Sequence, residues 1–171
     1  MSPSAILFDW DNTLVDNWSA IHDALNATLA AFGQPAWTRE QALERVRESM
    51  RDSFPRLFGD RWEDARDHFY SGFRERHLSA LNIRPFAVET LDFCAARGVP
   101  LAVVSNKNGA LLRAEVDQLE WAGWFQVVLG AGDAVRDKPD PAPALAALER
   151  MTLPPAEDVW FVGDTEVDVD C

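Results

Sequence analysis

Residues 8–16 read FDWDNTLVD, and they overlap the end of a four-residue apolar run at positions 5–8. A short apolar run bounded by polar residues predicts a buried strand, and open α/β sheets bind their ligands at the carboxyl ends of such strands. If the strand continues past residue 8, positions i and i+2 share one face. We therefore expect the carboxylates of Asp9 and Asp11 to converge on one point, with the hydroxyl of Thr13 nearby where the chain turns away.

Two carboxylates at this spacing suit phosphoryl transfer. One can attack phosphorus and become an aspartyl phosphate, while the other takes or gives the proton of the entering or leaving oxygen. A divalent cation is needed because carboxylates and an anionic phosphoryl group otherwise repel each other. The same residues also fit an ordinary strand end followed by an Asx-type turn, with Asp11, Asn12 and Thr13 as capping residues. The stretch alone leaves both interpretations open.

The composition indicates a globular protein with an acidic surface. The chain has 171 residues, 47% of them hydrophobic, and a formal net charge of −12. Such a charge argues against nucleic acid or an anionic membrane surface as the main partner. No apolar run is long enough to span a membrane, and the initial MSPS lacks the basic start of a secretion signal. Two cysteines suggest neither a disulfide scaffold nor a zinc site, so we expect a cytoplasmic protein.

Residues 17–81 carry helical patterns and no strand signal. Apolar residues recur at helical spacing from Trp18 to Phe32, and Thr38 begins a capping box that opens a second helix with its apolar stripe at positions 43, 46 and 50. Pro55 and Gly59 then break the chain before a third helix that starts near Trp62. This segment is therefore predicted to be a small helical insertion between two strands of an α/β body.

Three further apolar runs predict parallel strands, at residues 100–104, 127–129 and 159–162. Helical patterns separate the runs. Polar residues follow each of them: SNKN at 105–108, DKPDP at 137–141 and GDTEVD at 163–168. Because the carboxyl ends of parallel strands meet at one edge of a sheet, these polar groups are expected to lie near Asp9.

Each polar group has a possible chemical use. Ser105 and Asn106 precede a helix start and can form an anion site, although an ordinary helix N-cap explains them better when they are taken alone. Lys138 lies in a loop stiffened by two prolines and can reach over the strand ends. Asp164 and Asp168 add two carboxylates at the same edge.

Two other binding functions are excluded. A dinucleotide fingerprint after Gly130 and Gly132 requires a third glycine where Val135 stands. An EF-hand calcium loop requires glycine at its sixth position, where Leu14 follows Asp9 and Val169 follows Asp164.

Taken together, the four motifs resemble the haloacid dehalogenase-like superfamily, and within it the phosphoglycolate phosphatase-like branch. The resemblance covers nearly the whole chain: DWDNT at 9–13 is similar to the first motif of the superfamily, Ser105–Asn106 to the second, DKPDP at 137–141 to the third and GDTEVD at 163–168 to the fourth. It implies a Rossmann-like parallel sheet sandwiched by helices. Residues 1–16 and 84–171 would form this core, and residues 17–83 would be the helical cap domain inserted after the first strand.

The resemblance also implies roles for the residues. Asp9 would be the nucleophile and a Mg²⁺ ligand, and Asp11 the general acid and base, with its backbone carbonyl on the metal. Thr13, Ser105 and Asn106 would hold the phosphoryl oxygens, and Lys138 would offset the charge shared by Asp9 and the phosphate. Asp164 would bind Mg²⁺ directly, while Asp168 would lie behind the direct ligands or orient Lys138.

We therefore expect a Mg²⁺-dependent phosphatase that acts on a small phosphorylated metabolite, with phosphoglycolate as the first choice. A dehalogenase is excluded because those relatives lack an acid at the position of Asp11. A phosphomutase of the same superfamily remains an alternative, since it shares these core residues.

The resemblance has one departure. The chain ends at Cys171, where relatives continue with a helix, a strand and another helix. A second alternative is therefore a truncated or partner-completed fragment that acts as a non-catalytic binding module and associates through an uncovered sheet edge.

Overall fold

The computed structural model of the chain describes residues 3–46 and 48–171 and divides into two compact units. One unit contains the chain up to Asp16 together with Asn82–Cys171, and the other contains Asn17–Leu81. We predicted the second boundary after residue 83. The structure has it after Leu81, because Asn82–Ile83 forms strand β3, which pairs antiparallel with β2 (Val15–Asp16) in the first unit.

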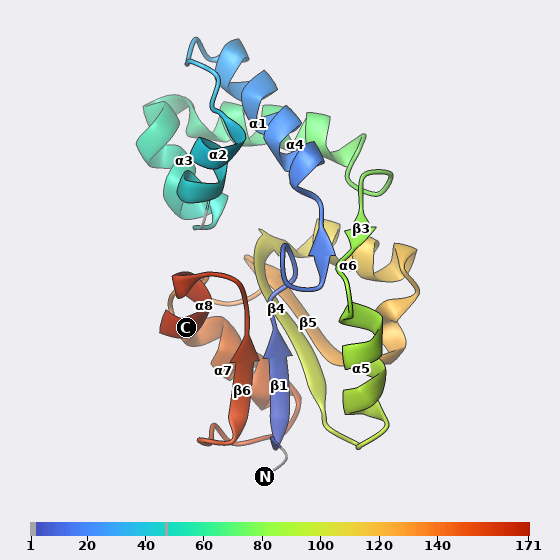
Figure 1. The fold of residues 1–171 in the computed structure, drawn as a ribbon. Coiled ribbons are helices and arrows are strands. Elements are labelled where there is room, and N and C mark those ends of the chain that lie inside the picture. Colours follow the sequence, from blue (N-terminus) through green and yellow to red (C-terminus); the bar gives the residue numbers. More distant parts are fainter. Residues whose placement is uncertain (1–2, 47) are drawn as a thin grey trace. The chain divides into compact units, whose positions relative to one another are not determined.

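The first unit is an α/β fold built on a four-stranded sheet with the order β5-β4-β1-β6 (Figure 1). Its strands are β1 (Ala5–Phe8), β4 (Leu101–Asn108), β5 (Phe125–Ala131) and β6 (Val159–Val162). All neighbouring strands are parallel, so their carboxyl ends point to one edge of the sheet. The predicted fold class is confirmed.

Helices cover both faces of this sheet (Figure 1). They are α5 (Ala87–Ala95), α6 (Gly109–Gln118) and α7 (Ala142–Arg150), with a 3₁₀ turn η2 at Trp121–Gly123. The short α8 (Glu166–Asp170) lies past the end of β6 (Figure 1). On one face, Ala147 and Leu148 of α7 pack against alternate strand residues such as Leu7 and Val104. This alternation is the two-residue period expected of a strand buried on both sides.

Strand β4 is longer than predicted. It continues through Ser105, Asn106 and Lys107 to Asn108, with a shift in its register against β5 after Val104. Asn108 then caps α6, because its side-chain oxygen accepts hydrogen bonds from the N–H groups of Ala110 and Leu111. The N-cap interpretation therefore applies to Asn108, whereas Ser105 and Asn106 remain part of the strand.

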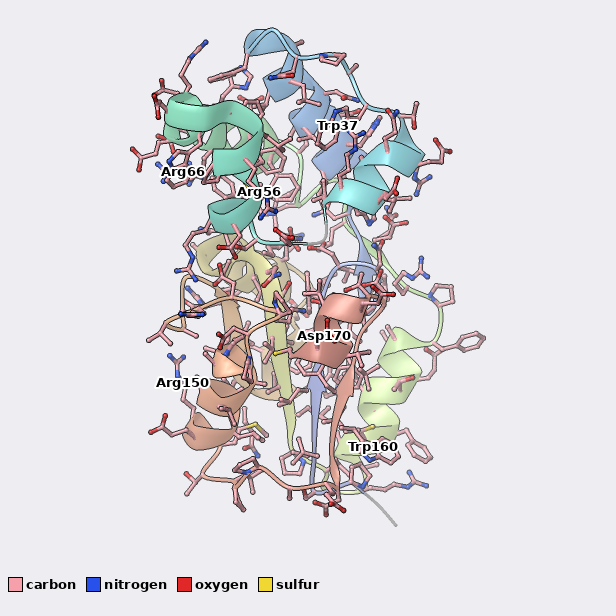
Figure 2. All side chains as sticks on the ribbon, turned by 90° about the vertical axis from the view of Figure 1, so that its left-hand side faces the viewer. Trp37, Arg56, Arg66, Arg150, Trp160 and Asp170 are labelled. Atoms are coloured by element: carbon pink, nitrogen blue, oxygen red, sulfur yellow. The ribbon has the colours of Figure 1, made fainter. Side chains whose placement is uncertain are left out.

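Strand β6 lies at an edge of the sheet. Phe161 packs against the α7 side of the core, and Trp160 is 50% exposed (Figure 2). Beyond the carboxyl end of β6, helix α8 carries the exposed Asp170 (Figure 2).

The second unit is helical. It contains α1 (Trp18–Ala31), α2 (Arg39–Arg45), α3 (Met50–Phe58), the 3₁₀ turn η1 (Gly59–Arg61) and α4 (Trp62–Arg74). The capping box at Thr38 and Gln41 is present at the start of α2. Aromatic residues form the core of this helical unit. Phe69 and Phe73 stack with ring centroids 5.6 Å apart, and Phe54 packs edge-on against Phe69.

Two helix boundaries in this unit differ from the prediction. The stripe at positions 43, 46 and 50 does not belong to one helix, because α2 ends at Arg45 and α3 begins at Met50. Pro55 lies inside α3 and does not break it. The helix ends at Phe58, before Gly59, whose φ of 56° is unfavourable for residues with a side chain. Within residues 3–46 and 48–171, none of the helices combines the length and apolarity needed to cross a membrane.

Candidate active site

The predicted site residues gather at the carboxyl edge of the sheet in the α/β unit. Asp9 follows β1 directly, and its N–H donates to the carbonyl of Val162 at the end of β6 (2.8 Å). This bond holds Asp9 beside Gly163 and Asp164, which follow β6. Topology alone thus brings together acids that are more than 150 residues apart in the sequence.

Asp9 and Asp11 do not lie on one continuing strand, contrary to our prediction. Strand β1 ends at Phe8, and the chain then turns with Asn12 in the left-handed region (φ 63°). The turn is closed by hydrogen bonds from the N–H of Asn12 to Val15 and from the N–H of Leu14 to Trp10. The turn leaves Trp10 buried in the core and Asp11 partly exposed. The positions of the two carboxylates are therefore determined by this tight turn and not by the alternation of side chains along a strand.

Lys138 is a buried cation between two carboxylates. Its ammonium donates to Oδ1 of Asp9 (2.8 Å) and to Oδ1 of Asp168 (2.6 Å), and the residue is only 2% exposed. Burial alone would lower the pKa of Lys138, but the two carboxylates outweigh this effect and raise it above its ordinary value. The ammonium group therefore stays charged at the edge of the sheet.

Asn106 holds the backbone of Lys138. The N–H of Lys138 donates to Oδ1 of Asn106, and Nδ2 of Asn106 donates to the carbonyl of Lys138, both at 2.9 Å. The predicted use of Asn106 was to bind phosphoryl oxygens. The structure instead joins both polar ends of its amide to the loop that carries Lys138.

Asp168 is fixed from both sides. Its Oδ1 accepts from Lys138, and its Oδ2 accepts from the N–H (3.0 Å) and hydroxyl (2.9 Å) of Thr165 in the cap of α8. A Cβ atom at Gly163 would overlap the Asp168 side chain. Glycine is therefore required here for the close approach of Asp168 to the end of β6.

Three carboxylates form a cluster that suits a cation. Asp9, Asp164 and Asp168 each present an oxygen atom, and these atoms lie within 4.8 Å of one another. Burial, followed by repulsion from Asp9, raises the pKa of Asp164 above its ordinary value, and Asn12 offsets part of this shift with a hydrogen bond. Crowded carboxylate oxygens are the donors that a hard divalent cation prefers, so the residues present fit such an ion.

Asp11 has a lysine of its own. Oδ1 of Asp11 accepts from the ammonium of Lys107 (2.7 Å), which also donates to Oε2 of the fully buried Glu115 (2.7 Å). Burial raises the pKa of Asp11 to about 6; Lys107 opposes this shift, whereas Glu115 and Asp9 add to it. We did not predict the contacts of Lys107 and Glu115. One feature of the sequence could have pointed to Lys107: the chain has only two lysines, and each lies in or beside a predicted site motif.

Two predicted site residues, Ser105 and Thr13, carry hydroxyl groups. Ser105 is buried, and its Oγ accepts from the N–H of Lys107 (3.2 Å). Oγ1 of Thr13 is buried and has no hydrogen-bond partner among the residues described. A buried polar atom without a partner costs about 1–3 kcal/mol, so the hydroxyl of Thr13 is ready to bond to a ligand.

The comparison with known proteins is consistent across sequence and structure. The sequence profile of the haloacid dehalogenase-like hydrolases matches residues 6–171. Phosphoglycolate phosphatase 1 of Pseudomonas aeruginosa is 28% identical over 98% of the chain, which spans 64% of that protein's length. The phosphoglycolate phosphatase of Rhodospirillum rubrum is 33% identical over 98% of the chain and 74% of its own length.

Solved structures agree in fold. A hydrolase of the same superfamily from Ehrlichia chaffeensis is 28% identical, with a TM-score of 0.66 over 99% of this chain and 83% of that one. A haloacid dehalogenase-like structure from Bacteroides fragilis has a TM-score of 0.91 at 24% identity, over 99% of this chain and 82% of that one.

Proposed function

The chain belongs to the haloacid dehalogenase-like hydrolase family, and from this premise we propose that it hydrolyses a small phosphomonoester through an aspartyl phosphate. The observation that carries the proposal is the different surroundings of two carboxylates in one turn. Asp9 is hydrogen-bonded to the buried Lys138, whereas Asp11 is paired with Lys107 and has a pKa raised to about 6. Two nearby carboxyl groups in different environments can divide the work of nucleophile and proton donor.

In the first step, an oxygen of Asp9 attacks phosphorus and the bond to the leaving oxygen breaks. The carboxyl group of Asp11 gives its proton to that oxygen, so that an alcohol leaves. Near neutral pH, a pKa of about 6 lets Asp11 act as an acid in this step and as a base in the second step. In the second step, the carboxylate of Asp11 takes a proton from water, which attacks the phosphoryl group and releases phosphate and free Asp9.

The remaining side chains bind and balance charge. Lys138 offsets the negative charge that Asp9 and the phosphoryl group share, and the hydroxyls of Thr13 and Ser105 donate to phosphoryl oxygens. Asn106 is assigned a different role from the one we first expected. Because its amide is bonded to the backbone of Lys138, it fixes the position of that lysine.

Asp9, Asp164 and the backbone carbonyl of Asp11 are proposed to hold a divalent cation, with Mg²⁺ as the ion. Such an ion, when bound, neutralises charge on the phosphoryl oxygens and lets an anionic nucleophile approach. Asp168 belongs to the same carboxylate cluster, but its two oxygens accept hydrogen bonds from Lys138 and Thr165. We therefore assign Asp168 to orienting Lys138 rather than to direct ligation.

Phosphoglycolate is the proposed first substrate to test, because the relatives at 28–33% identity are named phosphoglycolate phosphatases. The helical unit, inserted between β2 and β3 of the α/β unit, is proposed as the cap that selects among compact phosphomonoesters and excludes bulk water. The cytoplasm is the proposed location.

The experiment is phosphate release from a panel of small phosphomonoesters, with Mg²⁺ and with chelator. Asp9→Asn keeps the shape of the side chain and removes the nucleophile, and Asp117→Asn makes the same change at an exposed position of α6. Turnover that needs Mg²⁺, disappears in Asp9→Asn and persists in Asp117→Asn supports the proposal. Folded protein that releases phosphate from none of the esters overturns it, and transfer to a sugar hydroxyl instead of water would identify a mutase.

A further inference from the structure

Glu115 is a buried acid in an apolar position. It lies on α6 in the stripe formed by Leu111, Leu112 and Val116, and it is 0% exposed. Placing a carboxylate in such surroundings costs several kcal/mol unless charged and hydrogen-bonding partners compensate for the lost water. Its partners therefore indicate why an acid is present where a leucine would pack well.

Two partners of Glu115 lead to Asp11. Oε2 of Glu115 accepts from the ammonium of Lys107 and from Nε1 of Trp10, each at 2.7 Å. Lys107 donates from the same ammonium to Asp11, and Trp10 precedes Asp11 in the chain. One carboxylate oxygen thus anchors the proposed proton donor twice, through its side chain and through its backbone.

The anchor is buried and packed against aromatic rings. The side chain of Lys107 is 5% exposed and that of Glu115 is 0% exposed, whereas that of Asp11 is 20% exposed. The Trp10 ring packs edge-on against Trp121 (centroids 5.7 Å apart) and Phe125 (6.5 Å). Among these four residues, Asp11 has the most exposed side chain, and it lies in the turn that follows β1.

We propose that Lys107 is a positioning residue that fixes the carboxyl group of Asp11 for proton transfer, and that Glu115 holds Lys107 in place. The proposal rests on the proposed function, in which Asp11 protonates the leaving oxygen. Lys107 is not assigned to the phosphate, because its ammonium group already faces two carboxylates at 2.7 Å. Fixing one oxygen of Asp11 leaves its other oxygen with a defined direction, and a displacement of about 1 Å in such a group can cost about 100-fold in rate.

The leaving group of the substrate distinguishes a positioning role of Lys107 from a purely structural one. An alkyl phosphomonoester needs a proton on its leaving oxygen, whereas p-nitrophenyl phosphate releases a stable phenolate without one. The value of kcat/KM reports the step in which Asp9 is phosphorylated. We expect Lys107→Met to lower kcat/KM about 100-fold for the best alkyl ester and less than about 10-fold for p-nitrophenyl phosphate.

Two further variants define the network. Glu115→Gln keeps an acceptor for Trp10 but removes one of the two negative charges that face Lys107. It should show the same leaving-group dependence in weaker form. Arg113→Met removes an ion pair of α6 with Asp133 (2.6 Å) that lies outside the proposed site, and it should leave both kcat/KM values unchanged. Equal losses on both esters in Lys107→Met would overturn the proposal, as would a loss that appears only in KM.

A stability measurement tests the contact without relying on turnover. Lys107→Met, Asp11→Asn and the double variant form a double-mutant cycle in urea denaturation. We expect the loss of urea midpoint in the double variant to be smaller than the sum of the losses in the single variants. Each single change removes one side of the contact between Lys107 and Asp11 and leaves the charge on the other side without it. Additive losses would show that Lys107 does not hold Asp11. If the native protein releases no phosphate from any ester, the proposed function fails while this cycle still decides whether the contact exists.

Discussion

The ammonium group of Lys138 lies 2.8 Å from Oδ1 of Asp9, and the same arrangement recurs two residues later between Lys107 and Asp11. Each lysine also bonds to a second buried acid, Asp168 in one case and Glu115 in the other. Because the chain has only two lysines, both are used at this edge of the sheet. The two aspartates of the turn thus have separate cationic supports, which allows their chemical roles to differ.

Removing Lys138 should affect both activity and stability. We expect Lys138→Met to lower phosphatase kcat by about 100–1,000-fold, because the charge shared by Asp9 and the phosphoryl group is no longer offset. The free energy of unfolding should fall by about 3–5 kcal/mol, since Asp9 and Asp168 would remain without their shared partner. Phosphate-release kinetics and urea denaturation measure the two effects. A variant with native activity would contradict the assigned role.

Asp168 should act through Lys138. Asp168→Asn keeps the size of the side chain but replaces the charge that faces the ammonium group, so we expect kcat to fall about 10–100-fold, as for other residues that orient a neighbour in a site. Asp170→Asn is the matched control, because Asp170 lies on the same helix α8 and is exposed. Indistinguishable kinetics of the two variants would show that the contact between Asp168 and Lys138 does not contribute.

The β6–α8 connection requires glycine at position 163. A Cβ atom there would overlap Asp168, so Gly163→Ala should force α8 or the Asp168 side chain to move and should cost about 1–3 kcal/mol of unfolding free energy. Gly123→Ala is the control, since a Cβ at Gly123 meets no atom within 4 Å. Thermal denaturation of both variants measures the difference. Equal midpoints would mean that the connection adapts at no cost.

Much of the fold could be predicted from the sequence because apolar periodicity and strand ends are local signals. Residues 159–162 form a strand with the predicted bounds, and the apolar run at residues 5–8 forms strand β1. A turn at Asp11–Thr13 was one of the two interpretations that the sequence left open, and the sequence could not decide for it, since a left-handed φ in a residue other than glycine depends on the hydrogen bonds around it. The break between α2 and α3 was missed for a related reason, because an apolar stripe does not specify whether one helix or two carry it.

The site was predictable where it follows the strand ends and not where it depends on packing. Asp9, Lys138, Asp164 and Asp168 come together because parallel strands end at one edge. Glu115 was missed because an acid on a helix normally faces solvent, and nothing local marks one that is buried. Its contact with Lys107 spans eight residues across a strand–helix junction, and the contact of Lys107 with Asp11 spans 96, so both required the folded chain.

Asp133 should make stability depend on acid pH. Burial alone would raise the pKa of Asp133, but the hydrogen bonds from Arg113 and from the N–H of Gly130 lower it below its ordinary value. A carboxyl group with a lowered pKa in the folded state contributes stability above its unfolded pKa, which is about 3.9, and loses it as pH falls through the folded value. Asp133→Asn should therefore be less stable than the native protein at pH 7. The difference should begin to shrink near pH 4 and vanish only when the pH is below the lowered pKa of Asp133 in the folded state.

Urea denaturation across this pH range, with Asp117→Asn as the exposed control, measures that dependence. A difference between Asp133→Asn and the native protein that is the same at every pH would show that the stabilisation does not come from the charge.

Mg²⁺ binding should depend on Asp164, and it can be measured without substrate. The pKa of Asp164 is raised by burial and by repulsion from Asp9, so the clustered carboxylates oppose one another until a cation neutralises them. We expect Mg²⁺ to raise the thermal midpoint of the native protein, by an amount that corresponds to about 2.7 kcal/mol at 100 times the dissociation constant. In Asp164→Asn the repulsion is relieved and a ligand is lost. In chelator, this variant should therefore be at least as stable as the native protein, and Mg²⁺ should raise its thermal midpoint only slightly. A rise in midpoint as large as that of the native protein would show that the cation binds elsewhere.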